Sequence, residues 1–317
     1  MTQKQAARKE GPPSRAQSLQ HRPSQPSHQI RSVLAEATSK LVTHGVDTAH
    51  LDAETLLAHA LTLTRAQLLA RLSSSISLVE QEAFQHLLAR RLRREPLAYI
   101  TGKREFWSRE FAVTPEVLIP RPETELLIET VLRLVAQSHT NSLQPPMRVL
   151  DIGTGSGCIA ITLAKELPTV ELWAVDLSSA ALTIALANAR HHGVEQRINF
   201  LQGDLFSAIP EDSRFDVVVS NPPYIARDEL TALQPEVRDW EPQAALDGGN
   251  DGLAFYRRLV NDSPKHLRPS GWLIMELGAG QCSIVMRLIQ AQSNFRESFC
   301  VQDYAGFNRV IAARSCA

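Results

Sequence analysis

The sequence predicts an α/β domain built on a seven-stranded, mostly parallel sheet, preceded by a small helical domain. After residue 147, short runs of β-branched residues alternate with segments of helical periodicity, which is typical of a parallel sheet covered on both faces. Two strand-like segments then lie close together near residue 310 and indicate a terminal hairpin with one antiparallel strand. Before residue 95, leucines recur at helical spacing without strand-like alternation.

The composition is that of a globular protein. Hydrophobic residues make up 44% of the 317 residues, and the formal net charge is −1. A charge so near zero gives no bulk electrostatic reason for a nucleic-acid partner, and we expect none. No apolar run approaches the roughly 18 to 20 residues of a membrane span, so we expect no membrane contact and a cytoplasmic location.

The cysteines give no indication of a metal site. They form no CxxC pair, and no histidine stands at metal-ligand spacing from them. We therefore expect reduced thiols and no bound metal. The four residues are Cys158, Cys282, Cys300 and Cys316.

The first part of the chain divides into three segments. Residues 1–28 are polar and rich in Pro, Ser, Gln and Arg, which predicts a disordered tail. Residues 29–98 are expected to form a domain of about four or five helices. Residues 99–120 carry aromatics, a Thr-Gly turn and prolines, which predict a hairpin linker and a rigid loop.

Residues 121–317 contain the elements of the α/β domain. A helix is expected to begin at Glu125. The expected strands cover residues 147–152, 171–176, 197–201, 215–220 and 271–277, followed by FCVQDY (299–304) and NRVIAAR (308–314). The other helices are expected near residues 157–167, 178–192, 251–266 and 279–291.

The first strand-to-helix turn reads DIGTGSG and is predicted to bind a ligand. Its glycines allow a tight turn and close approach of the backbone to a bound molecule. The dinucleotide fingerprint would need a further glycine where Cys158 stands, so the spacing favours a ligand without a pyrophosphate. S-adenosylmethionine (SAM) is the obvious candidate. The expected contacts are Gly153, Thr154, Gly155, Ser156 and Gly157.

The ends of the next two strands supply the other expected cofactor contacts. Asp176 ends the second strand, where a carboxylate can accept both ribose hydroxyls of an adenosine. Ser178 follows and can cap the next helix. Asp204 and Leu205 come after the third strand, and we expect them to flank an adenine ring, one with a polar and one with an apolar side chain.

The fourth strand runs directly into Asn221, Pro222, Pro223 and Tyr224. This NPPY motif, together with the glycine turn, resembles the amino-methyltransferases, which methylate planar nitrogens of adenine, guanine or glutamine. Such a nitrogen is a poor nucleophile, and the Asn221 side-chain oxygen and the Pro222 carbonyl can accept its two hydrogens. The prolines hold these acceptors rigidly, and Tyr224 offers a flat face to the planar group.

We therefore expect Asn221, Pro222 and Tyr224 to act in catalysis. All four residues of the motif are expected to bind substrate, and Asn221 also to contact SAM. No general base is evident, and none is needed before transfer, because the sulfonium is a strong electrophile.

Several segments together resemble the release-factor glutamine methyltransferases, the PrmC or HemK family. The match covers roughly residues 30–315 and is carried by TGKREFW, VLIPRPETE, LDIGTGSG, VDLS, NPPYI, WEPQAALDGGNDGLAFYR and LIMELGAGQ. The resemblance implies a Rossmann-like, SAM-dependent methyltransferase domain and a helical domain for substrate recognition. It implies methylation of the glutamine amide in the GGQ motif of class 1 peptide chain release factors. We also expect a monomer.

Three alternatives stay open at this point. A ribosomal-protein glutamine methyltransferase shares NPPY but usually differs at the loop that reads IPRPETE here. An adenine-specific DNA methyltransferase would need a basic recognition segment, of which the arginines at 90–94 are the only candidates. A catalytically silent ribosome-binding module is disfavoured by the intact glycine turn and Asn221.

Overall fold

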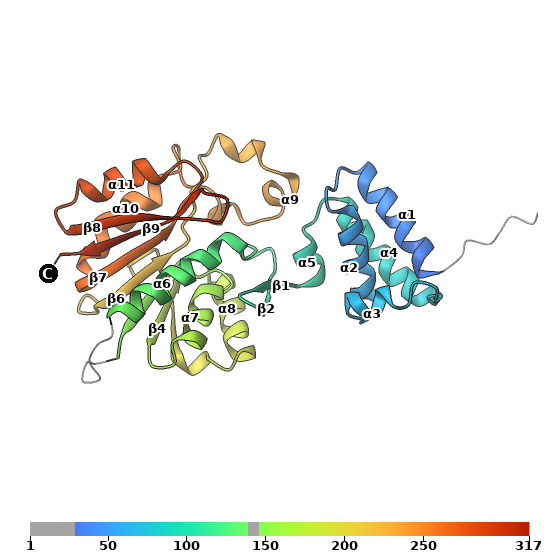
Figure 1. The fold of residues 1–317 in the computed structure, drawn as a ribbon, viewed down its shortest axis with the longest axis horizontal. Helices are drawn as coiled ribbons and strands as arrows, with labels where there is room; N and C mark the ends of the chain where they lie inside the picture. The colour runs from blue at the N-terminus through green and yellow to red at the C-terminus, as the bar shows by residue number, and fades with distance from the viewer. Residues whose placement is uncertain (1–28, 139–145, 317) are drawn as a thin grey trace, which may run out of the picture.

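The computed structural model describes residues 29–138 and 146–316 of the chain. The predicted tail, residues 1–28, lies outside the described residues. A helical part and a larger part that contains the sheet are joined by a short hairpin (Figure 1).

The helical part has its own apolar core. Leu56, Leu57, Phe84 and Leu88 are at most 1% exposed and belong to one buried cluster with the other helices. Two of the helices begin with a capping box. The side chain of the N-cap residue accepts a hydrogen bond from the backbone N–H of the third helical residue, and the side chain of that third residue accepts one from the backbone N–H of the N-cap residue. The helices are α1 (Ile30–Thr43), α2 (Ala49–Ala60), α3 (Arg65–Leu69), α4 (Leu78–Leu92) and α5 (Leu97–Thr101). Four or five helices were predicted here.

The predicted hairpin follows as β1 (Lys103–Phe106) and β2 (Arg109–Ala112), which pair antiparallel. Phe106 and Phe111 are buried in the same cluster as the sheet, so the hairpin packs against the larger part. An irregular loop then leads into the 3-10 turn η1 (Pro122–Thr124) and helix α6 (Glu125–Ser138).

The sheet has seven strands in the order β5-β4-β3-β6-β7-β9-β8, and β9 runs antiparallel to the other six. This confirms the predicted architecture. The strands are β3 (Arg148–Ile152), β4 (Glu171–Asp176), β5 (Ile198–Gln202), β6 (Phe215–Ser220), β7 (Leu267–Glu276), β8 (Phe295–Gln302) and β9 (Asn308–Ser315). Strand order reverses between β3 and β6, which is where open α/β sheets bind ligands, at the carboxyl ends of the strands.

Helices cover both faces of the sheet (Figure 1). Helices α6 (Glu125–Ser138), α7 (Cys158–Glu166) and α8 (Ser179–His191) contribute to one buried cluster. Helices α10 (Ala254–Asp262) and α11 (Cys282–Gln290) contribute to the other. The short helical elements are η2 (Glu195–Arg197), η3 (Glu229–Ala232), α9 (Pro235–Arg238), η4 (Gln243–Ala245) and η5 (Ser263–Lys265).

Several predicted boundaries differ from the structure; the strand expected at 299–304, for example, is β8, which covers Phe295–Gln302. The helix expected near 251–266 is divided: α10 ends at Asp262, and the separate turn η5 begins at Ser263 and has Pro264 as its second residue. Proline lacks the amide hydrogen that a continuing helix would use, so a new turn begins there. Strand β7 starts at Leu267, earlier than predicted, because Leu267 already pairs with Phe215 of β6. A register irregularity follows, and regular pairing resumes at Val217 and Trp272.

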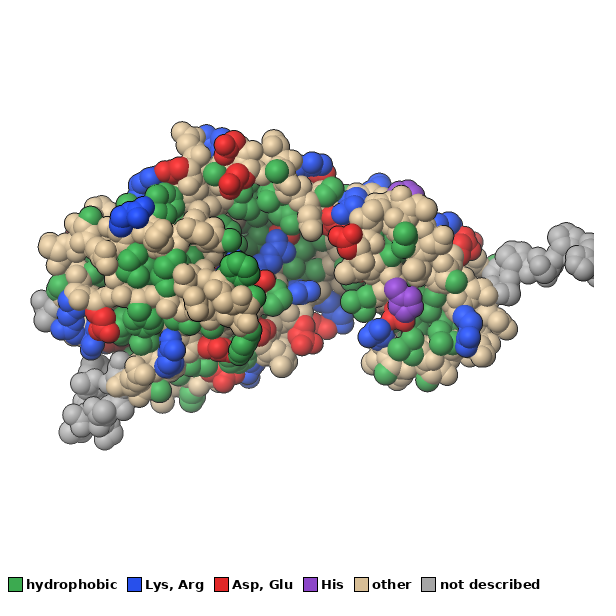
Figure 2. All heavy atoms as spheres, turned by 45° about the horizontal axis from the view of Figure 1, so that its top comes forward, with side chains coloured by type: hydrophobic (Ala, Val, Ile, Leu, Met, Phe, Trp, Pro, Cys, Tyr) green, Lys and Arg blue, Asp and Glu red, His purple; other side chains and the backbone are tan. Residues whose placement is uncertain are grey.

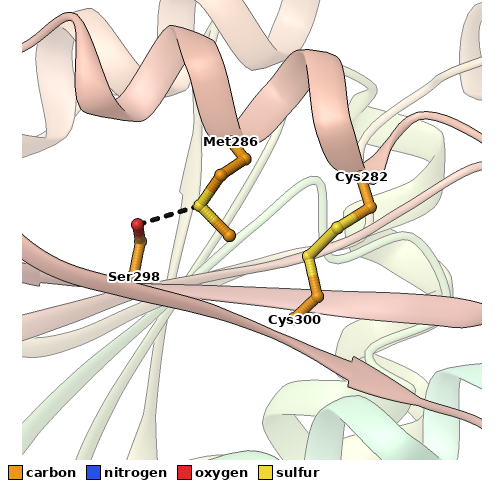
Figure 3. The surroundings of a disulfide bond; sticks show 4 residues. All are labelled: Cys282, Met286, Ser298 and Cys300. Carbon is orange, nitrogen blue, oxygen red and sulfur yellow. Dashed lines mark hydrogen bonds between the residues drawn. A yellow bond between two sulfur atoms is a disulfide. The ribbon is translucent and has the colours of Figure 1, made fainter.

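The expectation of four reduced thiols is wrong for two of them. Cys282, the first residue of α11, forms a disulfide with Cys300 on β8 (Figure 3). Helix α11 packs over β8 and β9, so the topology places together two cysteines whose sequence spacing carries no signal. Cys158 and Cys316 are free. Within residues 29–138 and 146–316, no helix combines the length and apolar character that crossing a bilayer requires.

Candidate active site

The carboxyl ends of the central strands open into a cavity of about 390 Å³. The space-filling view shows the surface hollowed, with hydrophobic side chains in the hollow, between the helical part and the sheet (Figure 2). Most of the predicted site residues line the cavity. They are Gly153, Thr154, Gly155, Ser156, Asp176, Asp204, Leu205, Asn221, Pro222 and Pro223. Gly157 and Tyr224 are not among the lining residues.

The glycine turn between β3 and α7 has the backbone shape that only glycine adopts easily. Gly153 and Gly155 have φ values of 75° and 54°, and a Cβ atom on either would meet nothing within 4 Å. Gly157 also has positive φ, but its Cβ would lie 2.8 Å from Ile161 Cδ1 and 3.2 Å from Ala185 Cβ. The first two glycines therefore leave open space above the turn, whereas the third allows α7 to pack on α8.

Asn188 on α8 connects this turn to the hairpin linker. Its Nδ2 donates to Ser156 O at 2.8 Å and to Ala112 O at 3.0 Å, and its Oδ1 accepts from Ala112 N. The side chain is 2% exposed, so these bonds are made away from water. Sequence reasoning missed Asn188, because an asparagine inside a helix carries no local indication of distant partners.

Asp176 ends β4, and its carboxylate stands beside the glycine turn. One oxygen accepts from Gly155 N at 2.8 Å and the other from Ser178 N at 2.9 Å. Each carboxylate oxygen can accept a second hydrogen bond, which leaves acceptors for two hydroxyl groups. The Ser178 side chain accepts from Ala181 N and caps α8, as predicted.

Asp204 and Leu205 follow β5 and also line the cavity. Asp204 pairs with Arg258 at 2.7 Å, and its side chain is 48% exposed. Leu205 has φ 53°, a conformation that costs a leucine free energy and that persists only where the surroundings hold it. This conformation places an apolar side chain on the cavity wall, where it can pack against a flat ring without stacking.

Asp151, the residue before the turn, was not singled out from the sequence. Its Oδ2 accepts from Thr154 Oγ1 at 2.7 Å and from Ala160 N at 3.2 Å. Its Oδ1 is buried and has no hydrogen-bond partner within the described part of the chain. Burial raises the pKa of this carboxyl to about 7. A buried acceptor without a partner is costly, so this carboxyl is a strained feature directly beneath the glycine turn.

The NPPY segment follows β6 at the edge of the cavity. Asn221 Nδ2 donates to Thr124 Oγ1 at 3.2 Å, and Asn221 Oδ1 has no partner among residues that the structure describes. The Pro222 carbonyl is likewise without a partner in the described ranges. Both residues line the cavity and are consecutive in the sequence, so these two acceptors are available to a substrate.

Three glycines pack closely against Tyr224. A Cβ atom at Gly248 would lie 2.8 Å from Tyr224 Cα, one at Gly252 2.4 Å from Tyr224 O, and one at Gly278 2.9 Å from the ring. Gln281 Nε2 donates to Tyr224 O at 2.9 Å. Burial raises the pKa of the phenol to about 12. The tight packing fixes the loop, while the predicted contact of the ring with substrate stays a prediction.

The loop before α6 and the loop after α9 complete the cavity wall, and the sequence analysis predicted only the first of them, as a rigid loop. Arg121 pairs with Glu241 at 2.6 Å, and Ile119 N donates to the same carboxylate at 3.4 Å. The Glu241 side chain is 1% exposed; burial raises its pKa and Arg121 opposes this rise. The loop before α6 is thereby fixed to the loop after α9.

A cluster of charges joins the helical part to the larger part. Arg91 and Arg94, at the end of α4, both pair with Glu236 on α9, at 2.9 and 2.6 Å. Arg94 also donates to the carbonyls of His44 and Gly45. The chain segment that carries α9 begins just after NPPY, so the helical part is tied to the neighbourhood of the cavity.

These features together define the class of the protein. Gly153 and Gly155 leave open space over the turn, Asp176 offers acceptors for hydroxyl groups, and apolar groups form much of the wall. Such a pocket fits SAM, and the fold with its NPPY motif is that of a SAM-dependent methyltransferase. The catalytic domain of hMettl16, in complex with an RNA hairpin, shares this fold with a TM-score of 0.52 at 19% identity, over 65% of this chain and 74% of that one.

Comparison with known sequences identifies the family. Residues 32–102 match the model of the PrmC N-terminal domain, and residues 124–235 match that of the methyltransferase small domain. The release factor glutamine methyltransferase of Geobacter sulfurreducens is 45% identical over 90% of this chain and 96% of its own length. That of Cereibacter sphaeroides is 44% identical over 89% and 96%. The chain therefore belongs to the release factor glutamine methyltransferase family.

Proposed function

We propose that this enzyme transfers a methyl group from SAM to the side-chain amide nitrogen of the glutamine in the GGQ motif of class 1 peptide chain release factors. The observation that carries the proposal is the pair of acceptors at the cavity, Asn221 Oδ1 and the Pro222 carbonyl. A primary amide presents two hydrogens on one nitrogen, and two adjacent acceptors hold that nitrogen in a single orientation.

The roles of the site residues follow from their positions. The glycine turn and Asp176 bind the adenosine and methionine parts of SAM, which supplies an electrophilic methyl group when bound. Asp204 and Leu205 flank the adenine. Asn221 and Pro222 orient the amide nitrogen, and the rigid proline backbone keeps the acceptors in place before the substrate arrives. The methylated nitrogen is positively charged and loses its proton afterward, so no general base is required before transfer.

The helical part is proposed to recognise the protein substrate. We place this domain at residues 29–98, the hairpin linker and loop at 99–120, and the methyltransferase domain at 121–317. The proposed cofactor residues all lie after residue 150, whereas Arg91 and Arg94 tie the helical part to Glu236 on α9, which lies in the chain segment that follows NPPY. A monomer is sufficient for this arrangement, because one chain supplies both parts.

The alternatives are disfavoured by specific observations. The relatives at 44 and 45% identity act on release factors according to their names, which favours that substrate over a ribosomal protein. For a DNA substrate, a basic surface would be required. Of the four arginines at 90–94, three are instead paired with carboxylates, Arg90 with Glu95 and both Arg91 and Arg94 with Glu236.

The test is mass spectrometry of a purified class 1 release factor after incubation with the enzyme and SAM. We expect a gain of one methyl group on the peptide that contains GGQ. A gain on a ribosomal protein, with none on the release factor, would assign the first alternative.

Asn221 variants test the mechanism in the same assay. Asn221→Ala should keep the fold and, with SAM bound at saturation, lower the single-turnover rate by about 10²–10³, because one preorganised acceptor is lost. Asn221→Asp still accepts, but its charge must be desolvated, so we expect a smaller loss than for alanine. An unchanged rate in Asn221→Ala would show that NPPY is only a structural elbow.

A further inference from the structure

Thr124 and Glu276 form a buried chain of hydrogen bonds with Asn221. Thr124 Oγ1 donates to Glu276 Oε2 at 2.6 Å, and Asn221 Nδ2 donates to Thr124 Oγ1 at 3.2 Å. Thr124 and Glu276 are each 2% exposed. The three residues come from η1, from the end of β7 and from the loop after β6, and they are brought together only by the fold.

The direction of this chain is set at its inner end. An ionised carboxylate can only accept, so the hydroxyl hydrogen of Thr124 is given to Glu276. The hydroxyl oxygen of Thr124 can then only accept from Asn221, so the Asn221 side chain must donate to it. The Asn221 amide therefore presents Nδ2 to Thr124 and turns Oδ1 to the other side. The two ends of an asparagine amide are nearly equal in shape, so hydrogen bonding and not packing selects between them.

We propose that Thr124 and Glu276 are positioning residues that keep the oxygen of the Asn221 amide turned toward the substrate nitrogen. The inference rests on the proposed function, because only a substrate with N–H groups needs an acceptor at this point. In the opposite orientation, Nδ2 would face the substrate's own hydrogens, and two donors would oppose each other. The chain thus makes one of two nearly isosteric states the productive one.

The direction of this hydrogen-bonded chain depends on the protonation state of Glu276, which the surrounding charges influence. Burial raises the pKa of Glu276 to about 7, and the hydrogen bond from Thr124 lowers it. Glu123 raises this pKa, while Arg309 and Arg121 lower it. Below this pH the protonated carboxyl can donate to Thr124, whose hydrogen is then free for Asn221 Oδ1.

The orientation of Asn221 should therefore become fixed as the pH rises through about 7. Tyr224, Tyr256 and Cys158 also sense the charge of Glu276, but burial raises their own pKa values far above this range, so they stay neutral in it.

The first experiment needs no substrate. Nitrogen-15 NMR of the intact enzyme follows the side-chain amide signal of Asn221, which is assigned by its loss in Asn221→Asp. We expect the signal to shift with pH through about 7 in the wild type and to lose this dependence in Glu276→Gln. Asp151 also has a pKa near 7, and it remains in Glu276→Gln, so a dependence that survives in this variant would overturn the proposal.

The second experiment measures single-turnover methylation of a release factor at saturating SAM and pH 8. Thr124→Val keeps the shape and removes the hydroxyl; we expect the rate to fall about tenfold, since one oriented hydrogen bond is lost, with SAM affinity unchanged. Thr124→Ser should recover most of that loss. Thr130→Val is the matched control, because Thr130 is also buried and its hydroxyl donates to Leu126 O on its own helix.

The outcomes separate the two proposals. A folded Thr124→Val enzyme with the wild-type rate would overturn the positioning role, as would Thr124→Ser that is no faster than Thr124→Val. If Thr124→Val does not fold, the NMR experiment tests the positioning role instead: loss of the pH dependence of the Asn221 signal in Glu276→Gln supports this role, and its survival overturns it. A wild-type enzyme that shows this pH dependence but leaves the release factor unmethylated would contradict the proposed function and keep the hydrogen-bonded chain.

Discussion

Two glycines of the same turn should respond in opposite ways to alanine. A Cβ atom at Gly155 meets no protein atom within 4 Å, so Gly155→Ala costs mainly the left-handed backbone, about 1–2 kcal/mol of unfolding free energy. The new methyl group extends into the space above the turn and should weaken SAM binding by the cost of overpacking, about 1–3 kcal/mol. At Gly157 the methyl group meets Ile161 and Ala185 instead. Backbone and packing costs then add to about 2–5 kcal/mol of lost stability.

The assay compares the urea unfolding of each variant with its SAM affinity from titration calorimetry. Gly157→Ala should lose stability and bind SAM normally once folded, whereas Gly155→Ala should stay folded and bind SAM about 5- to 150-fold more weakly. Gly193→Ala is the control, because Gly193 follows α8, has φ 69° and also has open space at its Cβ. If Gly155→Ala binds SAM as tightly as Gly193→Ala, the turn does not approach the cofactor and the reasoning is refuted.

Three further predictions concern the cofactor, the disulfide and the charged junction. Asp176→Ala should weaken SAM binding by about 2–4 kcal/mol through lost charge-assisted hydrogen bonds, and Asp176→Asn by less; calorimetry would exclude the role if affinity is unchanged. Joint replacement of Cys282 and Cys300 by serine should lower the unfolding free energy by about 3 kcal/mol, read as a smaller urea midpoint than that of the oxidised wild type. Glu236→Ala leaves two arginines of α4 without this partner, so KM for the release factor should rise while the Kd for SAM stays constant; a parallel rise of both would place the junction in the cofactor site.

Local patterns were enough to predict most of the residues that were later found to line the cavity. The glycine turn, Asp176 and NPPY each follow a strand directly, and the carboxyl ends of parallel strands must meet at one edge. Asp151 could equally have been singled out from the sequence, since a carboxylate at the end of a buried strand is unusual. It was overlooked because a single acid before a glycine turn was taken as part of the strand.

The remaining features depend on contacts between distant segments. Glu276 meets Thr124 across 152 residues, and Asn188 meets Ala112 across 76. A threonine before a helix or an asparagine within one has an ordinary local explanation, so neither residue type indicates such a partner. The disulfide was missed for the same reason. The absence of a CxxC pair said nothing about a helix and a strand that pack together.

The order of the strands also has a consequence for how the molecule is completed during synthesis. The helical part makes contacts that are close in sequence and has its own core, so it can fold soon after it leaves the ribosome. The central strand β3 must wait for β6 on one side, and β6 must wait for β7. Glu276 is the last residue of β7, and Gly278 and Gln281 beside Tyr224 follow it. The binding cavity is thus among the last parts of the nascent chain to acquire its final shape, after the helical part has already folded.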